Sequence, residues 1–188
     1  MTIHFDKINN YIKCLDNETL KVLESISSDK KFKKGDLLLR QNEICDKSYL
    51  IISGIARKFY LNNGKEITTE LYFENDLAVS FDSYSLQLPS REFIEALTDV
   101  TVSIIHYQAF QDAKLKYPKL LALDLMYAEY YGMWVENRLI EFHTMTATER
   151  YLEILNKSPH VIQKIPLTII ASYLGITLET LSRIRAKI

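Results

Sequence analysis

The apolar positions between residues 31 and 107 come in short runs that are separated by turn residues. These runs are of strand length and rich in Ile, Tyr, Phe and Thr, which pack well on a pleated sheet. Asn63 and Gly64 lie between two of them and tolerate the positive φ of a tight hairpin turn. Many short strands with regular turns predict a β-roll or jelly roll with closed or protected edges. The runs are LLLR, SYLII, IARKFYL, ITTELYF, LAVSF, EFIEAL and VTVSIIHY.

Helical patterns flank this region on both sides. Residues 5–28 read as helical, and Asp16 or Asn17 is placed to cap a helix there. Pro118 suits the first turn of a second helix, and residues 119–143 contain no further proline and a single glycine. We therefore expect one long helix of about 25 residues, which would span about 38 Å.

Six positions of the long helix are separated by alternating intervals of three and four residues, which is the heptad spacing of a coiled-coil seam. One of them is Asn137, and a polar residue within a seam fixes register and oligomeric state. Two interpretations stay open: a single helix packed on its own β domain, or a seam between two subunits. The helix is longer than a small domain needs, which favours the dimer. The six positions are Leu123, Met126, Tyr130, Met133, Asn137 and Ile140.

The C-terminal region predicts a capped helix followed by a helix pair. Thr146 and Glu149 have the spacing of a capping box. Gly175 stands where a helix end prefers a left-handed residue, and Thr177 is a natural N-cap for the next helix. Ala171 is small enough for two helices to cross steeply at this point, as in a helix-turn-helix. The buried side of the pair would comprise Leu167, Ile170, Ala171, Leu174, Leu181, Ile184 and Ile188.

The opposite side of the second helix is polar, and such a face suits hydrogen bonding to base edges and phosphates. An ordinary helical hairpin is the alternative, but the match here extends through the cap, the buried positions and Arg183. We therefore predict that the chain binds double-stranded DNA. The predicted contact residues are Thr177, Leu178, Glu179, Thr180, Ser182, Arg183, Arg185 and Lys187.

Charge is distributed unevenly along the chain, whose formal net charge is −1. Residues 144–188 include six basic and three acidic residues, a balance of +3 that leaves −4 for the remainder. The chain as a whole is therefore not a general binder of polyanions. A mildly basic tail on an acidic body indicates two functions on one chain.

Several classes of protein are excluded by what the sequence lacks. The sequence contains no run of about 18 apolar residues, so it predicts no membrane span. The N-terminus has no signal pattern. We therefore expect a cytoplasmic protein. Cys14 and Cys45 are the only cysteines. Two cysteines cannot make a disulfide framework or a four-thiolate cluster, so we expect both to be ordinary small apolar residues and expect no metal site.

The order of these features resembles the CRP/FNR superfamily of bacterial transcription regulators over nearly the whole chain. The resemblance rests on the turns around Gly35, Gly54 and Gly64, on the long helix before Thr144, and on IASYLGITLETLSRIR. It implies an α+β fold with three parts. These are a β-roll or jelly-roll sensor of the cyclic-nucleotide-binding type at 1–117, a dimerisation helix at 118–143, and a winged-helix-like helix-turn-helix domain at 144–188.

The resemblance also implies a homodimeric, non-enzymatic regulator that binds a palindromic promoter site, with RNA polymerase as a further candidate partner. In that superfamily the second helix enters the major groove, and its base-contacting positions match Leu178, Glu179 and Arg183. Glu179 would accept from a cytosine amino group, and Arg183 would donate to guanine. Leu178 replaces the basic residue of the family's cyclic-AMP receptor, so the preference at that base pair should differ.

The sensor departs from the cyclic-AMP-binding members, which hold the ribose with the Glu of a Gly-Glu pair and the cyclic phosphate with an Arg. By the resemblance, Val79 and Ser80 stand at the Gly-Glu pair, and Ser90 stands at the Arg position with Arg91 one residue late. A one-residue offset in a strand points a side chain to the opposite face, so Arg91 reaches the pocket only if the loop is bulged. Losing the guanidinium removes a contact of about 1.5–3 kcal/mol. We therefore expect no tight binding of cyclic AMP, no certain cofactor, and an unidentified effector.

Other effectors find little support. A cluster of the FNR type needs four cysteines, and this chain has only two. The long helix carries the aromatic group Tyr127, Tyr130, Tyr131 and Trp134 where effectors of the superfamily touch it. Tyr127 and Tyr130 are the candidates for lining the pocket, although seam packing explains the group more simply. The alternative function is a cupin-like small-molecule-binding β-roll without DNA binding. Cupin metal sites need clustered His and Glu, and only His106 lies in the β region.

Overall fold

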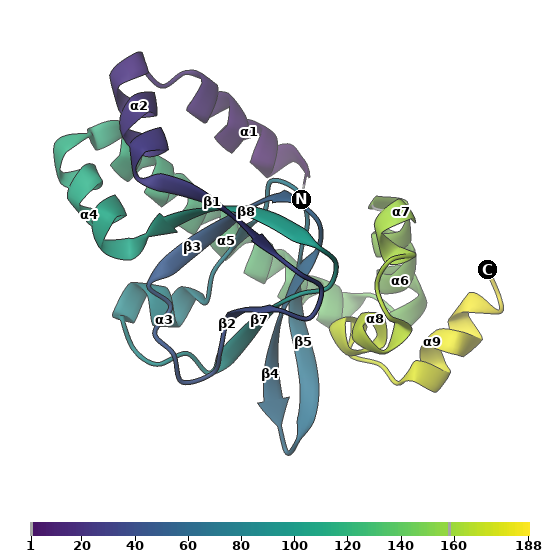
Figure 1. The fold of residues 1–188 in the computed structure, drawn as a ribbon. Helices are drawn as coiled ribbons and strands as arrows, with labels where there is room; N and C mark the ends of the chain where they lie inside the picture. Colours follow the sequence, from purple (N-terminus) through teal and green to yellow (C-terminus); the bar gives the residue numbers. More distant parts are fainter. Residues whose placement is uncertain (1, 158) are drawn as a thin grey trace.

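The computed structural model describes residues 2–157 and 159–188 (Figure 1). Its strands are β1 (Ser27–Phe32), β2 (Leu37–Leu39), β3 (Lys47–Ser53), β4 (Ala56–Asn62), β5 (Lys65–Tyr72), β6 (Leu77–Ala78), β7 (Glu92–Ala96) and β8 (Val100–His106). Its helices are α1 (Thr2–Lys13), α2 (Asn17–Ser25), α3 (Phe81–Leu86), α4 (Tyr107–Lys116), α5 (Pro118–Thr144), α6 (Ala147–Lys157), α7 (Pro159–Ile162), α8 (Leu167–Leu174) and α9 (Leu178–Arg185).

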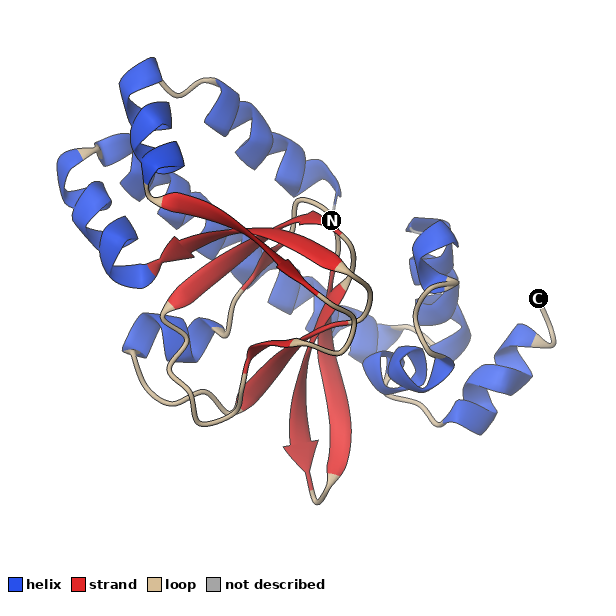
Figure 2. Ribbon diagram, in the orientation of Figure 1, coloured by secondary structure: helices blue, strands red, loops and turns tan. Residues whose placement is uncertain are grey.

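Within the described residues the strands form two four-stranded antiparallel sheets, with the orders β1-β8-β3-β6 and β2-β7-β4-β5. Apolar side chains from both sheets fill one common core, in which Ile51, Ile94 and Val102 are fully buried. Figure 2 shows the strands together at the centre, with helices at both ends. The predicted β-roll and the α+β fold class are confirmed.

The β4–β5 hairpin turns at Asn63 and Gly64, whose φ angles are 51° and 77°. This is the backbone conformation for which Asn and Gly are suited. The strand pairing then contains an irregularity, because Phe59 pairs with Thr68 whereas Lys58 pairs with Glu70. Thr69 is therefore an extra residue in β5, which makes a β-bulge.

The N-terminal helical region is divided and shorter than expected. Asp16 caps α2, and its carboxylate accepts from the Thr19 N–H at 2.8 Å, which confirms one of the two cap candidates. The predicted helix over 5–28 is wrong at its C-terminal end, because β1 begins at Ser27 and pairs with β8. Pairing along a whole strand outweighs local helical spacing.

The predicted strand LAVSF is also corrected. Only Leu77 and Ala78 pair with β3, and the chain then turns at Ser80 into α3. Ser80 has an extended backbone at the N-cap of that short helix. As a result Ser80 lies at the end of the roll, beside the strands β4 and β7 of the second sheet.

The long helix and the capped helix after it form as predicted. Helix α5 extends from Pro118 to Thr144 and connects the roll to the C-terminal helices α6–α9 (Figure 1). The Thr146 N–H donates to Glu149 Oε2 at 2.7 Å, and the Glu149 N–H donates to Thr146 Oγ1 at 3.3 Å. These reciprocal bonds confirm the capping box.

Candidate nucleic-acid interface and sensor pocket

Helices α8 and α9 meet at 101°, within the range of a helix-turn-helix. Gly175 has φ 68° and ψ 34°, and it ends α8 in the left-handed conformation. The Ile176 N–H donates to the Ala171 carbonyl and the Gly175 N–H donates to the Ser172 carbonyl, each at 3.0 Å. This pair of bonds is the Schellman pattern, so local backbone chemistry sets the steep turn.

The side of the pair that the spacing predicted to be apolar is buried, against α6, α7 and the roll. Ile170, Ala171, Leu174, Leu181 and Ile184 belong to one apolar cluster, and Leu167 packs against it. Ile188 is a correction: it lies beyond the end of α9 and its side chain is 61% exposed. One face of α9 is thereby fixed inward and the other faces solvent.

The outward face of α9 carries the predicted reading residues, and all of them are exposed except the half-buried Thr180. Thr177 caps the helix by accepting from the Thr180 N–H at 3.2 Å. Arg183 Nη2 donates to Thr180 Oγ1 at 3.2 Å, which holds the guanidinium along the helix. Hydrogen bonds from its own N–H and from Thr177, with Arg183 nearby, lower the pKa of Glu179. Glu179 is therefore a carboxylate acceptor at neutral pH.

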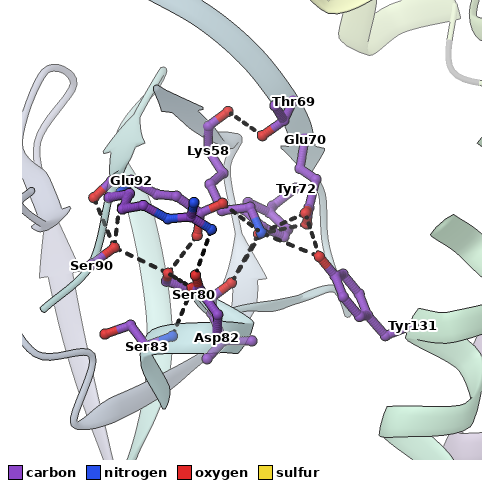
Figure 3. A network of polar contacts seen from close by, with 12 residues as sticks. Lys58, Thr69, Glu70, Tyr72, Ser80, Asp82, Ser83, Ser90, Glu92 and Tyr131 are labelled. Carbon is purple, nitrogen blue, oxygen red and sulfur yellow. Dashed lines mark hydrogen bonds and ion pairs between the residues drawn. The ribbon is translucent and has the colours of Figure 1, made fainter. Parts of the chain in front are cut away.

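An internal ion pair lies within the roll, beside two of the predicted pocket residues. Lys58, 2% exposed, points from β4 into the roll, and its Nζ lies 2.5 Å from Glu70 Oε1 and 3.5 Å from Glu92 Oε1 (Figure 3). Burial on its own would lower the pKa of Lys58, but the charges of Glu70 and Glu92 outweigh it and raise that pKa. The ammonium group is therefore retained at neutral pH despite its burial.

Tyrosine hydroxyls complete the partners of Glu70. Tyr72 donates to Glu70 Oε2 at 2.7 Å, and Tyr131 of α5 donates to Glu70 Oε1 at 3.0 Å. Burial and the charge of Glu70 raise the pKa of Tyr131 to about 12, so its hydroxyl stays protonated and able to donate. The Tyr131 ring also stacks on Phe81 of α3, with centroids 4.7 Å apart. The network thus joins the second sheet to α3 and α5.

Two of the predicted pocket residues take part in this network. Ser80 donates to the Glu92 carboxylate, and Ser90 Oγ donates to Ser80 Oγ at 3.0 Å. The Glu92 N–H donates in turn to Ser90 Oγ at 3.0 Å. Both serines are fully buried, so their hydroxyls are engaged within the protein. We call the set Lys58, Glu70, Tyr72, Ser80, Ser90, Glu92 and Tyr131 the pocket network.

The other predicted pocket residues lie elsewhere. Arg91 points to solvent, with its side chain 73% exposed, and pairs with Asp82 at 3.0 Å. Arg91 lies in a bend just before β7, and it points away from the network that the side chain of its neighbour Glu92 joins. Val79 packs in the core between the sheets. Tyr127 and Tyr130 pack on a separate apolar cluster of α1, α4 and α5, and their neighbour Tyr131 reaches the network instead.

The N-terminal half of the seam predicted on α5 is covered within the chain, whereas Met133, Asn137 and Ile140 are exposed. Leu123 is 3% exposed and packs in the same cluster as Ile8 and Leu120, and Met126 and Tyr130 pack against it. This half of the seam is covered by the chain's own helices α1, α2 and α4. The heptad spacing identified an apolar face of the helix. It could not show whether the chain's own helices or a second subunit covers that face.

A different apolar face of α5 is open to solvent. Its positions also follow alternating intervals of four and three residues, and it carries large exposed side chains beside two small residues. A Cβ added at Gly132 would meet nothing within 4 Å, so this glycine faces open space. We call this face the α5 stripe; it comprises Leu121, Leu125, Ala128, Gly132, Val135 and Leu139.

Two structural findings bear on other classes of protein. Among the described residues no group of three or more His, Cys, Asp or Glu could hold a metal ion. No single helix in that part of the chain is long and apolar enough to cross a membrane. The bent pair α8–α9 meets the criterion by length and composition, but its apolar side chains belong to the buried cluster described above.

Comparison with known proteins agrees with this geometry. Residues 29–117 match the cyclic nucleotide-binding domain family. The anaerobic regulatory protein of Haemophilus influenzae is 28% identical over 185 residues, which cover 90% of this chain and 70% of that protein. The roll, the long helix and the helix pair follow one another here in the order that the resemblance implies. These similarities agree with the resemblance to the CRP/FNR superfamily.

Solved structures share the fold at low sequence identity. FixK2 from Bradyrhizobium japonicum has a TM-score of 0.73 and 19% identity, covering 86% of this chain and 84% of that one. The c-di-GMP responsive global regulator CLP of Xanthomonas campestris has a TM-score of 0.72 and 12% identity, covering 92% and 91%. The fold of this chain is thus that of these two solved structures.

The pocket network yields a stability prediction. Lys58→Met should reduce the free energy of unfolding by about 3–5 kcal/mol, because it leaves two buried carboxylates without their cation. Arg91→Met is the matched control; it breaks an exposed pair and should cost about 1 kcal/mol or less. Urea unfolding of the three proteins measures both values. Equal small losses would contradict the buried placement of Lys58.

Proposed function

We propose that this chain is a homodimeric, sequence-specific DNA-binding regulator of transcription whose sensor does not bind cyclic AMP. The observation that carries the proposal is the α8–α9 pair. Its two helices cross at 101°, its apolar side is buried, and its polar side is exposed on one helix. A helix presented in this way fits the major groove of B-DNA, which is wide enough to admit it.

The chemistry of the exposed face supports specific roles. Arg183 supplies a fork of donors that matches the two acceptors of guanine, and the ionised Glu179 accepts from the amino group of cytosine. Leu178 is 38% exposed at the first turn of α9 and offers an apolar contact for a thymine methyl group. Thr177, Thr180 and Ser182 suit phosphates or either base edge. Arg185 and Lys187, at the end of the helix, suit the phosphate backbone.

Binding should depend on two copies of the pair. The region 144–188 has a balance of only +3, and few phosphate contacts give weak non-specific attraction. Two reading helices about 34 Å apart would engage successive major grooves of a palindromic site. RNA polymerase is a further partner that such a regulator would meet at a promoter.

The α5 stripe is the face that we assign to the dimer. A two-fold axis beside it would place Leu125 and Leu139 of each copy against the partner helix, as an isologous interface requires. Ala128 and Gly132 would let the helix backbones approach closely at the centre. This also accounts for a glycine in the interior of a helix, where it costs about 1 kcal/mol.

The sensor pocket supports the exclusion of cyclic AMP. Ser90 stands where cyclic-AMP-binding members have their guanidinium, and Arg91 points away from the roll. Ser80 is engaged with Glu92, whose carboxylate would repel a cyclic phosphate. Entry of a nucleotide would also have to break the Lys58–Glu70 pair. An effector of a different chemical class, or none, is consistent with this interior.

The first prediction concerns DNA reading. Arg183→Ala should weaken binding to the preferred site by about 1–3 kcal/mol and relax specificity at one base pair, because the guanine loses its bidentate donor. Selection from genomic fragments followed by gel-shift titration measures this. Lys31→Ala, which removes one exposed charge from β1, is the control and should change little. If the protein selects no DNA sequence, the result favours the cupin-like alternative. If both variants weaken binding equally, Arg183 contributes only its positive charge and does not read a base.

The second prediction concerns the dimer. Leu125→Asp should raise the dimer dissociation constant at least about a hundredfold, because it buries two carboxylates against each other across the axis. Sedimentation equilibrium measures it. Asn137→Asp is the control, since Asn137 lies about 160° around the helix from Leu121 and Leu139 at 3.6 residues per turn. Dissociation by Asn137→Asp alone would restore the seam predicted from the sequence.

The third prediction concerns the effector. Calorimetric titration with cyclic AMP should give no dissociation constant in the micromolar range or tighter, for the reasons given for Ser90 and Ser80. A cyclic-AMP-binding regulator titrated in parallel shows that the ligand is active. A micromolar constant for this protein would refute the exclusion while leaving the DNA-binding proposal intact.

A further inference from the structure

Strand β5 is the last strand of its sheet, so among the described residues no strand pairs with its outer edge. Helix α8 packs against this edge. The Thr68 N–H donates to Ser172 Oγ at 2.9 Å, and the Ser172 hydroxyl donates to the Glu66 carbonyl at 3.1 Å. One hydroxyl group thus satisfies both a donor and an acceptor on the open edge, as another strand would.

Apolar contacts reinforce this junction. Ile55, Leu71 and Leu97 come from the roll, yet they belong to the same buried cluster as Ile170 and Leu174 of α8. Leu71 faces this cluster because the bulge at Thr69 reverses the alternation of side chains along β5. The first helix of the pair is therefore packed on the sensor itself as well as on the C-terminal helices.

Two arginines hold the C-terminal end of the same helix. Arg138 of α5 donates to the Tyr173 carbonyl and lies over the Tyr173 ring, with its guanidinium carbon 3.9 Å from the centroid. Arg150 of α6 donates to the Leu174 carbonyl at 3.1 Å. Cations at a helix C-terminus pair with carbonyls that have no partner within the helix. Strand β5, α5 and α6 therefore fix α8 from three sides.

We propose that Ser172 is a positioning residue, which fixes the DNA-reading pair on the edge of β5 and so sets the orientation of α9 relative to the sensor. The inference rests on the proposed function, since it assigns Ser172 a role in the same DNA reading. Ser172 lies on α8, whereas the predicted reading residues all lie at or after the N-cap of α9. It acts through the Gly175 turn, which joins α8 to α9 with a fixed geometry.

The hydroxyl matters because it is directional. Apolar packing of α8 on Leu71 tolerates sliding and rotation, whereas one hydroxyl bonded to an adjacent N–H and carbonyl selects one register. A dimer binds a palindrome with both reading helices at once, so free movement of either must be lost on binding. Holding α8 in place before DNA arrives removes that cost, which is the general advantage of preorganisation.

The position also connects the pocket network to the reading pair. Glu70, bonded to Lys58 and Tyr131, is two residues from Thr68, bonded to Ser172, in the same strand. A change in the network that shifts β5 would shift the edge on which α8 sits.

The experiment removes the hydroxyl and little else. Ser172→Ala should speed hydrogen exchange at the Thr68 amide at least about tenfold in the DNA-free protein. It should weaken binding to the preferred site about five- to tenfold, in line with the loss of two modest hydrogen bonds. Affinity for non-specific DNA and the dimer dissociation constant should not change. Ser172→Thr, which restores the hydroxyl, should recover both the protection of Thr68 and the specific affinity.

The outcomes separate this inference from the proposed function. Ser25→Ala deletes a hydroxyl–backbone bond in α2 and controls for general loss of stability. Unchanged exchange at Thr68 would overturn the inference, as would faster exchange with an unchanged or increased specific affinity. An equal loss of specific and non-specific affinity would also overturn it, because that indicates loss of structure rather than of position. If the unaltered protein selects no DNA sequence, the proposed function fails, while the Thr68 measurement still reports on the docking.

Discussion

The contact between Lys58 and Glu70 depends on one unpaired residue, Thr69, in strand β5. Without it, Thr69 would stand opposite Lys58, and Glu66, Thr68, Glu70 and Tyr72 would all share one face. The extra residue reverses the alternation, because side chains change face at every step of a strand. Glu70 and Tyr72 then point into the roll, while Thr68 joins Arg57 on the other face, where Arg57 Nη1 donates to its hydroxyl at 3.3 Å.

A buried lysine beside two carboxylates is tolerated only because each charge has partners. The ammonium group of Lys58 is bonded to Glu70, Glu70 accepts from two tyrosines, and Glu92 accepts from Ser80. Desolvation of such groups costs several kcal/mol each, so the network adds little net stability but penalises any arrangement that breaks it. The interior of this sensor is therefore specified by polar pairing as well as by apolar packing. The same pairing leaves Lys58, Glu70, Ser80 and Glu92 bonded to one another.

The sequence predicted best what is encoded locally. Gly175, Thr177 and the Thr146–Glu149 box each act over four residues or fewer, and the helix pair and its exposed face followed from them. The pocket was predicted poorly, because the Thr69 bulge leaves no local signal and because Lys58 reads as an ordinary strand residue. Tyr131 stood within the predicted aromatic group, but only tertiary packing separates it from Tyr127 and Tyr130. That packing also decides which apolar face of α5 the chain covers.

The connection from α5 to α6 is too short to be a domain linker, yet it does not by itself fix the orientation of α8 and α9. Side-chain contacts must do so. Only Met145 and Thr146 separate the two helices, and two residues still allow a wide range of angles. Phe142, near the end of α5, narrows the range of angles, because its ring lies directly over Gly175. A Cβ at this position would lie 2.9 Å from the ring and would displace it. Arg138 adds the bond to Tyr173, one turn earlier on α5. These contacts hold the turn between α8 and α9 against α5. The helix pair could still rotate about this turn, and the bonds of Ser172 to the edge of β5 prevent that rotation. The orientation of α9 therefore depends on both the long helix α5 and the strand β5, and a movement of either would change the direction of its exposed face.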